Sequence, residues 1–413
     1  MRKSMRSACA LCVMFAVMLM TGCRDIPPQD PPYDPEQPAE LVEGTFDVAV
    51  DELTAEAVTI TITPSKEVDY YYAILMPDTE AFRDLNDELV ATEELAKPDA
   101  EQMIFRGSQT LTFEGLIGHS HYTLIYFQYN SEENSLFGEL HRSERITTPD
   151  GEEAFDIEVT SLTGLGASLS VSPDDKSASY YLWFEPKENY EDKFEASDFL
   201  LVQNDFGYWQ YVASLQGIDN WLDVMADDLV KGTKYLNSDD ICRLLMWNTE
   251  YMVYAYGINA QGNMTTQLTK HLFSTPKPAV EDLTFDIDIT SMEWSTAYNR
   301  YAVDAHVIPS KLDVPYFVTI TNLDWYEWYF TDANNGRSDE DYIIYQILLN
   351  TSSTSHDILA DYRLQGEATY KPYEARNQYL NPSKRYGVFV FGLSEDGPTT
   401  PLAVYEFETP ARQ

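Results

Sequence analysis

The same pattern of residues occurs three times along this chain, and that internal repeat constrains the fold more than any other feature. Each copy has an initial Phe, a Pro, a Tyr seven residues after the Pro, a Leu six residues before a second Tyr, and a final Thr-Pro pair. These landmarks are Phe46, Pro64, Tyr71, Leu116, Tyr122 and Thr148; Phe155, Pro173, Tyr180, Leu245, Tyr251 and Thr275; and Phe285, Pro309, Tyr316, Leu380, Tyr386 and Thr409. Repeats of this length indicate tandem domains, which we place at residues 43–150, 151–279 and 280–413.

The N-terminal segment has the properties of a processing signal. Basic residues from Arg2 to Arg6 precede an apolar stretch at residues 8–20, which is too short to span a bilayer comfortably. The residues from Leu19 to Cys23 resemble a bacterial lipobox. This resemblance implies a lipoprotein signal peptide at residues 1–22 and lipid attachment at Cys23. The alternative is an ordinary secretory signal followed by a chance cysteine.

An acidic, proline-rich segment follows the signal. Residues 23–42 contain almost no hydrophobic side chains, so we expect an extended tether that holds the folded part away from a membrane. The formal net charge of the whole chain is −41. A surface of that charge repels phosphate backbones and anionic lipids, which argues against nucleic acid and leaves the lipid anchor as the membrane contact.

The start of each repeat has the alternation of a half-buried strand. In the first repeat, Phe46 and Val48 share one face while Asp47 and Ala49 share the other. Near the end of each repeat, the Leu and the Tyr six residues later resemble the tyrosine corner of fibronectin type III and related immunoglobulin-like domains. The resemblance implies three tandem fibronectin type III-like β-sandwiches, in which the Tyr hydroxyl bonds to backbone near the preceding Leu.

The middle of each repeat is longer than that family requires, and it changes to helical period. Apolar residues at helical spacing predict helices in all three inserts: Phe82, Leu85 and Leu89; Trp221, Leu222, Met225 and Leu229; and Ile344, Ile347 and Leu348. Ser338 and Asp341 have the spacing of a capping box. Gly107 and Gly232 follow cations and are interpreted as helix ends.

The central strands, such as residues 70–76, are apolar on both faces. Such strands need a cover on the side that faces away from the partner sheet. We therefore predict a mainly β fold with helical inserts, in which each insertion covers the outer face of one sheet.

Motifs for catalysis or metal binding are missing from the sequence. It has no zinc-protease helix, phosphate-binding Gly loop or nucleophile elbow, and the closely spaced Cys9 and Cys12 would leave with the signal peptide, so we predict no catalytic residue, metal or cofactor. His119 and His121 have a spacing that suits a metal, but no third ligand is apparent, and a corner loop is the favoured interpretation. A glycosidase needs only two opposed carboxylates, which counting among 68 acids does not exclude.

One aromatic cluster stands out at the start of the third insert. Residues 324–330 combine aromatic side chains with two flanking carboxylates, an arrangement with which many proteins hold sugar rings. The candidate ligand-binding residues are Trp325, Tyr326 and Trp328. The alternative interpretation is that these side chains attach the insert to its sheet.

These features favour a non-enzymatic, membrane-anchored lipoprotein that acts as a binding or adhesion module for a glycan or a protein. Two alternatives stay open: a structural spacer or stalk, and a hydrolase with an unrecognised site. The organisation resembles the multi-domain lipoproteins of gut Bacteroidetes, which implies an outer-membrane location on either the cell surface or the periplasmic side.

Overall fold

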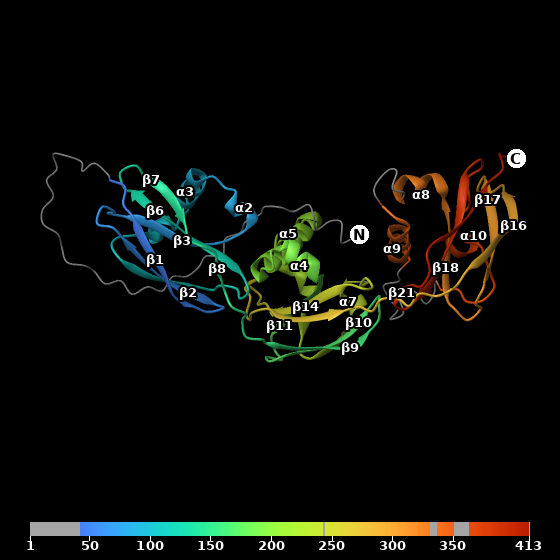
Figure 1. Cartoon of the computed structure of the whole chain (residues 1–413), viewed down its shortest axis with the longest axis horizontal. Helices are drawn as coiled ribbons and strands as arrows, with labels where there is room; N and C mark the ends of the chain where they lie inside the picture. The colour runs from blue at the N-terminus through green and yellow to red at the C-terminus, as the bar shows by residue number, and fades with distance from the viewer. Residues whose placement is uncertain (1–41, 243, 331–336, 351–362, 413) are drawn as a thin grey trace.

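The structure is a computed structural model that describes residues 42–242, 244–330, 337–350 and 363–412. The predicted signal peptide, Cys23 and nearly all of the predicted tether lie outside the described residues. The described chain is mainly β, with antiparallel sheets that follow one another in three pairs (Figure 1).

In the first repeat, one sheet has three strands and the facing sheet has five. The first sheet contains β1 (Phe46–Leu53), β2 (Ala57–Pro64) and β5 (Gln109–Glu114), in the order β1-β2-β5. The second contains β4 (Ile104–Phe105), β3 (Tyr71–Pro77), β6 (His121–Asn130) and β7 (Ser135–Arg142) in that order, with β8 (Ile146–Thr147) also paired to β6. The chain therefore crosses between the sheets after β2, after β4 and after β5.

The other two repeats have the same plan. In the second, the sheets are β13-β10-β9 and β12-β11-β14-β15, from β9 (Phe155–Leu162), β10 (Ala167–Pro173), β11 (Ser179–Pro186), β12 (Val230–Lys231), β13 (Lys234–Asn237), β14 (Glu250–Gly257) and β15 (Thr269–Ser274). In the third, they are β16-β17-β19 and β18-β20-β21 with β22 on β20, from β16 (Phe285–Ser295), β17 (Arg300–Pro309), β18 (Tyr316–Asn322), β19 (Ala368–Tyr370), β20 (Arg385–Ser394), β21 (Gly397–Pro398) and β22 (Ala403–Glu408).

Each pair of sheets encloses a hydrophobic core. Val58, Ile60 and Ile62 of β2 are fully buried, while the threonines between them face outward. Their partners in the core include Tyr71 of β3 and Leu124 of β6. The predicted alternation in the opening strands is thus confirmed, and it places one face of each sheet in the core.

The tyrosine corner is present in all three repeats. The backbone N–H groups of Ile117, Met246 and Asn381 donate to the hydroxyls of Tyr122, Tyr251 and Tyr386 at 2.9, 2.8 and 2.9 Å. The same three residues accept a hydrogen bond through their carbonyls from Thr148, Thr275 and Thr409 at 2.8, 2.6 and 2.7 Å. The Thr of each closing Thr-Pro pair therefore stabilises the corner through a second hydrogen bond to the same residue. The sequence pattern alone did not reveal this role.

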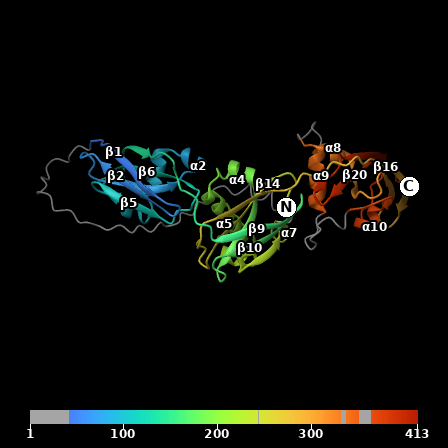
Figure 2. The ribbon, with the colours of Figure 1, turned by 60° about the horizontal axis from the view of Figure 1, so that its bottom comes forward.

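Helices fill the middle of each repeat. They are α2 (Glu80–Arg83), α3 (Asp87–Leu95) and the 3-10 helix η2 (Ala100–Met103); α4 (Lys187–Lys193), α5 (Asp198–Gln216), α6 (Trp221–Met225), η3 (Ala226–Asp228) and α7 (Ser238–Cys242); and α8 (Leu323–Phe330), α9 (Asp339–Leu349) and α10 (Pro372–Arg376). Figures 1 and 2 show most of them on the same side of the row of sheets.

These helices build second cores on the sheets. In the first repeat, Phe82 and Val90 pack with Tyr72, Ile125 and Phe127, which lie on the face of β3 and β6 that points away from the sandwich core. In the second, helix residues such as Leu201 and Trp209 pack on Tyr181 and Tyr254 in the same way. In the third, Tyr342 and Phe330 pack on Phe389.

The glycines interpreted as helix ends have another position. Gly107 lies between β4 and β5, and Gly232 lies between β12 and β13, each with a φ of +65°. The interpretation as helix ends is therefore wrong, because the chain turns here from one sheet to the other. Glycine suits the turn because it alone adopts this left-handed backbone without strain.

Candidate functional site

The three aromatic residues singled out by the sequence lie on α8, but they do not share one environment. Tyr326 is buried, with 8% of its surface exposed, while Trp328 is 60% exposed. Trp325 is half-buried against the core beneath the helix. Its backbone N–H donates to Asn322 Oδ1 at 3.0 Å, which fixes the first turn of α8.

Tyr326 belongs to the core. Its ring centroid lies 4.7 Å from that of Phe389 and 5.0 Å from that of Tyr342. The hydroxyl donates to Asp339 Oδ1 at the start of α9, and burial together with this carboxylate raises the pKa of Tyr326. For this side chain, the structure agrees with the alternative interpretation, attachment of the insert to its sheet.

The two tryptophans, Trp325 and Trp328, form part of a larger, partly exposed surface on α8 and α9. We define the α8–α9 surface as Trp325, Trp328, Tyr329, Tyr345, Leu348 and Leu349. The ring of Trp325 lies 5.3 Å from Tyr329 and 5.5 Å from Tyr345. Tyr329 and Tyr345 are 42% and 37% exposed, so this surface offers ring faces and edges to solvent.

Sequence reasoning missed the contribution of α9 to this surface. Tyr345 comes from the helix that follows residues 331–336, and nothing in the local spacing links it to Trp325. Leu348 is 42% exposed, which contradicts its assignment to the apolar face with Ile344 and Ile347, and Leu349 beside it is exposed as well. The buried face of α9 is formed instead by Tyr342, Ile343, Gln346 and Ile347.

Charged side chains border the α8–α9 surface. Arg385 Nη2 lies 2.7 Å from Glu327 Oε1 and 3.6 Å from Glu406 Oε2, and Arg385 Nη1 lies 3.6 Å from Asp324 Oδ1. One cation therefore faces three carboxylates. The ring cluster is consequently bordered on this side by negative charge.

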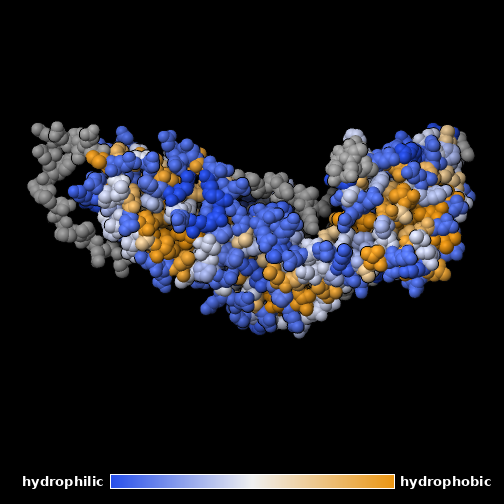
Figure 3. Space-filling view, viewed as in Figure 1, coloured by the Kyte–Doolittle hydropathy of each residue, from blue (hydrophilic) through white to orange (hydrophobic). Residues whose placement is uncertain are grey.

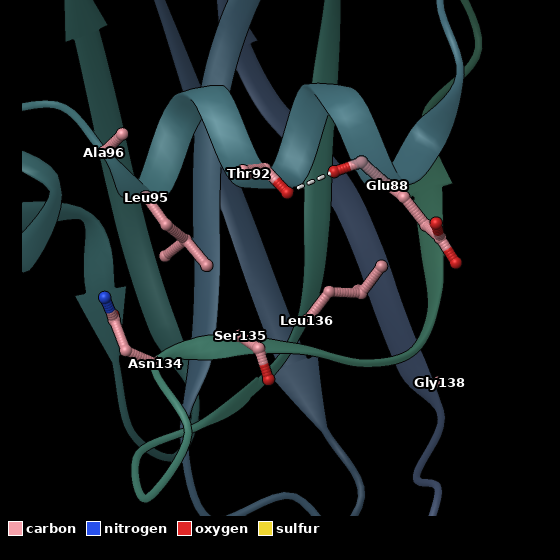
Figure 4. A pocket seen from close by; sticks show the side chains of 8 residues that line it. All are labelled: Glu88, Thr92, Leu95, Ala96, Asn134, Ser135, Leu136 and Gly138. Carbon is pink, nitrogen blue, oxygen red and sulfur yellow. Dashed lines mark hydrogen bonds between the residues drawn. The ribbon is translucent and has the colours of Figure 1, made fainter.

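A second candidate lies in the first repeat, where an open groove separates α3 from β7 (Figure 4). Glu88, Thr92 and Leu95 line it from the helix, and Leu136 and Gly138 line it from the strand. Figure 4 shows the side chain of Leu95 extending from the helix toward the strand, and that of Leu136 extending from the strand toward the helix. Both also contact the core between the helices and the sheet, so the groove has an apolar floor.

The two histidines near the first corner bind protein groups. His119 Nδ1 lies 2.9 Å from Asp150 Oδ1. His121 Nε2 lies 3.1 Å from the carbonyl of Glu195 in the second repeat, and its Nδ1 lies 3.0 Å from Thr147 Oγ1. Burial lowers the pKa of His121, and the hydrogen bond to Glu195 opposes that effect only in part. These contacts match the favoured interpretation of a corner loop.

Within the described ranges, no group of three or more His, Cys, Asp or Glu side chains has an arrangement that could hold a metal ion. Among the same residues, no helix combines the length and apolarity needed to cross a bilayer.

Comparison with known proteins finds matches among solved structures only. No family model matches the chain, and no curated protein matches it. Among solved structures, the chain is similar to the FN1–FN3 domains of chicken CNTN1, with 13% identity, a TM-score of 0.23, and 88% of this chain and 97% of that chain covered. It is also similar to the central fibronectin-III array of RIM-binding protein, with 9% identity, a TM-score of 0.16 and coverages of 90% and 99%. At these TM-scores, neither similarity bears on the function of this chain.

Proposed function

We propose that this chain is a non-enzymatic binding or adhesion module, built from three fibronectin type III-like sandwiches at residues 43–150, 151–279 and 280–413. In this proposal, a helical insertion covers the outer face of one sheet in every sandwich. The repeated sheet order and the three equivalent tyrosine corners support it. Rigid sandwiches with variable segments between their strands are a common way to present a binding surface.

The observation that carries the binding role is the α8–α9 surface. Trp328, Tyr329 and Tyr345 are exposed although neighbouring aromatic side chains of the same helices are buried. Clustered exposed apolar groups on a soluble domain mark interaction sites, and tryptophan and tyrosine are the side chains that contribute most to binding energy. A glycan would stack its rings on these faces, and a protein would bury them in its own surface.

The test is a double substitution, Trp325→Ala with Trp328→Ala, in the full chain. We expect loss of binding on glycan and host-protein arrays, with a melting temperature close to that of the unaltered chain. Tyr235→Ala is the matched control, because Tyr235 is an aromatic side chain on β13 that is 80% exposed. If the double variant unfolds, both tryptophans serve the core, and the proposed surface is refuted.

We further propose that the chain is anchored in the outer membrane through a lipid on Cys23. Replacing Cys23 by Ala should move the protein from the membrane fraction to the soluble fraction and abolish labelling with a fatty-acid analogue. Retention of the variant in membranes would contradict the proposal. For the unaltered protein, protease treatment of intact cells would distinguish a location on the cell surface from one on the periplasmic side.

Two alternatives have distinct readouts. A spacer or stalk would bind nothing on the arrays, and shortening it by one repeat would change reach without changing binding. A hydrolase would release product from a panel of polysaccharide and peptide substrates. Activity that survives removal of the α8–α9 tryptophans would favour a catalytic site elsewhere.

A further inference from the structure

The groove between α3 and β7 lies beside an unpaired strand edge. In the sheet order β4-β3-β6-β7, β7 is the terminal strand, and among the strands of the described residues it pairs with β6 alone. A terminal strand presents backbone N–H and C=O groups on its outer side, where another extended chain can pair with them. The C-terminal end of β7 is tied to the helices, since Arg142 Nη1 lies 2.6 Å from Asp87 Oδ1. The open part is therefore the first half of the strand, from Ser135 to Gly138.

The helix supplies the opposite wall of the groove. Glu88, Thr92 and Leu95 follow one another at spacings of four and three residues, which places them on one face of α3. Thr92 Oγ1 donates to the Glu88 carbonyl at 2.7 Å, so its methyl group and not its hydroxyl is available to an occupant. With Leu95 and Leu136 at the floor, the groove can accept a medium-sized apolar side chain.

Negative charge surrounds the opening. Glu88 lines the groove, and no cation is among the residues that line it. Glu43 lies on the other side of the strand, where its Oε1 would be 2.6 Å from a Cβ at Gly138. Because the whole chain has a net charge of −41, a second copy would be repelled from this edge, and a basic partner would be attracted to it.

The corresponding strand edge is shorter in the second repeat. Lys270 of β15 pairs opposite Tyr254, as Arg142 of β7 pairs opposite Ile125, and Lys270 Nζ likewise reaches a carboxylate of the covering helix, 2.9 Å from Asp198 Oδ2. However, β15 begins at Thr269, directly before this bridge, whereas β7 begins at Ser135, seven residues before Arg142. The groove is thus a property of this repeat and not of the repeated plan.

We propose that this groove binds an extended, basic peptide segment of a partner protein. The segment adds a strand to the outer edge of β7 and places an apolar side chain between Leu95 and Leu136, with a cation two residues away on the same face, beside Glu88. The alternate side chains, on the opposite face, are cations directed toward Glu43. Strand addition beside a helix supplies affinity through backbone hydrogen bonds and specificity through alternate side chains. The site is separate from the α8–α9 surface, so either proposal can fail alone.

The test uses a fluorescein-labelled peptide of repeating Lys-Lys-Val-Lys as the probe and the purified full chain as the receptor. As a strand, this peptide presents both Lys and Val on one face and Lys alone on the other. We expect saturable binding in fluorescence anisotropy that weakens as salt is added. We also expect slower hydrogen exchange in β7 and α3 upon binding. Glu88→Lys should weaken binding about fivefold or more, whereas Glu93→Lys, an equal charge change at an exposed position of α3 outside the groove, should have little effect.

Several outcomes overturn the proposal. Equal losses for Glu88→Lys and Glu93→Lys mean that the probe senses only the general acidity of the chain. Equal binding of a Lys-Pro peptide, which lacks half of the backbone donors, excludes strand addition. Protection in another segment places the probe elsewhere, and a concentration-dependent dimer without probe assigns the edge to a second copy. The Trp325→Ala, Trp328→Ala variant should bind the probe normally, which separates this result from the test of the α8–α9 surface.

Discussion

The two junctions between repeats are built by the same structural element and held by opposite chemistry. At each junction, the loop of a tyrosine corner contacts the next repeat. In the first repeat this loop reads Gly118-His119-Ser120-His121, and in the second it reads Leu244-Leu245-Met246-Trp247. The first contact is mainly polar and charged, with Ile117 packed against the second repeat, and the second is mainly apolar. The position of the corner therefore determines where the repeats meet. The side chains of the corner loop determine whether the junction is sensitive to salt and pH.

The junction of the first and second repeats is a hydrogen-bond network. Glu195 Oε2 lies 2.8 Å from Arg83 Nη2, and its Oε1 accepts from the Glu80 N–H at 2.9 Å. Farther along, Asp198 N–H donates to the His119 carbonyl and Phe199 N–H donates to Ser120 Oγ. Glu195 has a φ of +51°, a conformation that costs an ordinary residue about 1 kcal/mol or more, and its contacts across the junction offset that strain.

The junction of the second and third repeats is a small hydrophobic core. Leu165 and Leu244 of the second repeat are buried with Ile343 and Ile347 of α9, next to Phe391 of β20. One polar contact accompanies them, from the Gly164 N–H to Asp396 Oδ1 at 2.9 Å. A side chain at Gly164 would meet the Asp396 carbonyl oxygen at 1.9 Å, so only glycine permits this approach.

The largest effect is expected from Leu165→Asp. A carboxylate among apolar side chains should weaken the second junction by about 3 kcal/mol, because burying an unpaired charge is strongly unfavourable. Hydrogen exchange in α9 should accelerate, while the first junction stays protected. Leu272→Asp is the control, since Leu272 is exposed on β15. Unchanged protection of α9 would show that Leu165 does not hold the repeats together.

A smaller effect is expected from Glu195→Ala at the first junction. Loss of the charged hydrogen bonds to Arg83 and to the Glu80 N–H should cost about 1.5 kcal/mol. Added salt should weaken the first junction of the unaltered chain and leave the second nearly unchanged. Glu188→Ala, an exposed carboxylate on α4, is the control. An equal response of both junctions to salt would remove the distinction drawn between them.

Replacing each corner tyrosine by Phe should show how much of the corner's effect is on its own sandwich and how much is on the junction. Tyr386→Phe removes one hydrogen bond far from either junction and should cost about 1 kcal/mol. Tyr122→Phe and Tyr251→Phe should cost a similar amount within their sandwiches and also loosen the junction that follows each corner. Hydrogen exchange at residues 194–199 and in α9 reports those two junctions. Identical behaviour of all three variants would mean that the corners act only within their own repeats.

The smallest effect is a pH response of the first junction. Burial alone would raise the pKa of Glu195, but the hydrogen bonds from Arg83 and the Glu80 N–H and the nearby arginine charges outweigh it, so this pKa is lowered. The pKa of His121 is also lowered, mainly by burial. Both groups bind protons less readily in the folded state, so their contribution is present at neutral pH. It is lost as the pH falls, first below 6.5 for His121 and then below 4.5 for Glu195.

Buried Asp198 opposes this trend, because burial raises its pKa despite the charge of Lys270. Folding favours its protonated form, so Asp198 adds stability as the pH falls. The expected net result is a first junction whose protection factors, which are corrected for the intrinsic pH dependence of amide exchange, are lower at pH 5 than at pH 7, with Glu195→Gln reducing the response below pH 4.5. A second junction that responds equally would contradict the assignment to these groups.

The helices show where sequence periodicity succeeds and where it fails. The capping box at Ser338 and Asp341 is confirmed, because it depends on local backbone geometry. In the first insert, Phe82 is buried as predicted, but Leu85 and Leu89 are exposed. The buried face of α3 is formed by Val90 and Ala91 instead. The long helix α5 was not predicted at all: its apolar residues are spread around the axis, so they give no clear helical stripe.

The sequence by itself determined the repeated plan. Alternating residues, the Pro after the second strand, and the Leu and Tyr of each corner act locally, through strand pleating and one hydrogen bond to nearby backbone, so they are readable in order along the chain. Only the tertiary structure decided that Tyr326 is core and Trp328 is surface, that Tyr345 joins them, and that a groove opens beside β7. These outcomes depend on how each helix is rotated against its sheet, which is set by packing between residues distant in sequence.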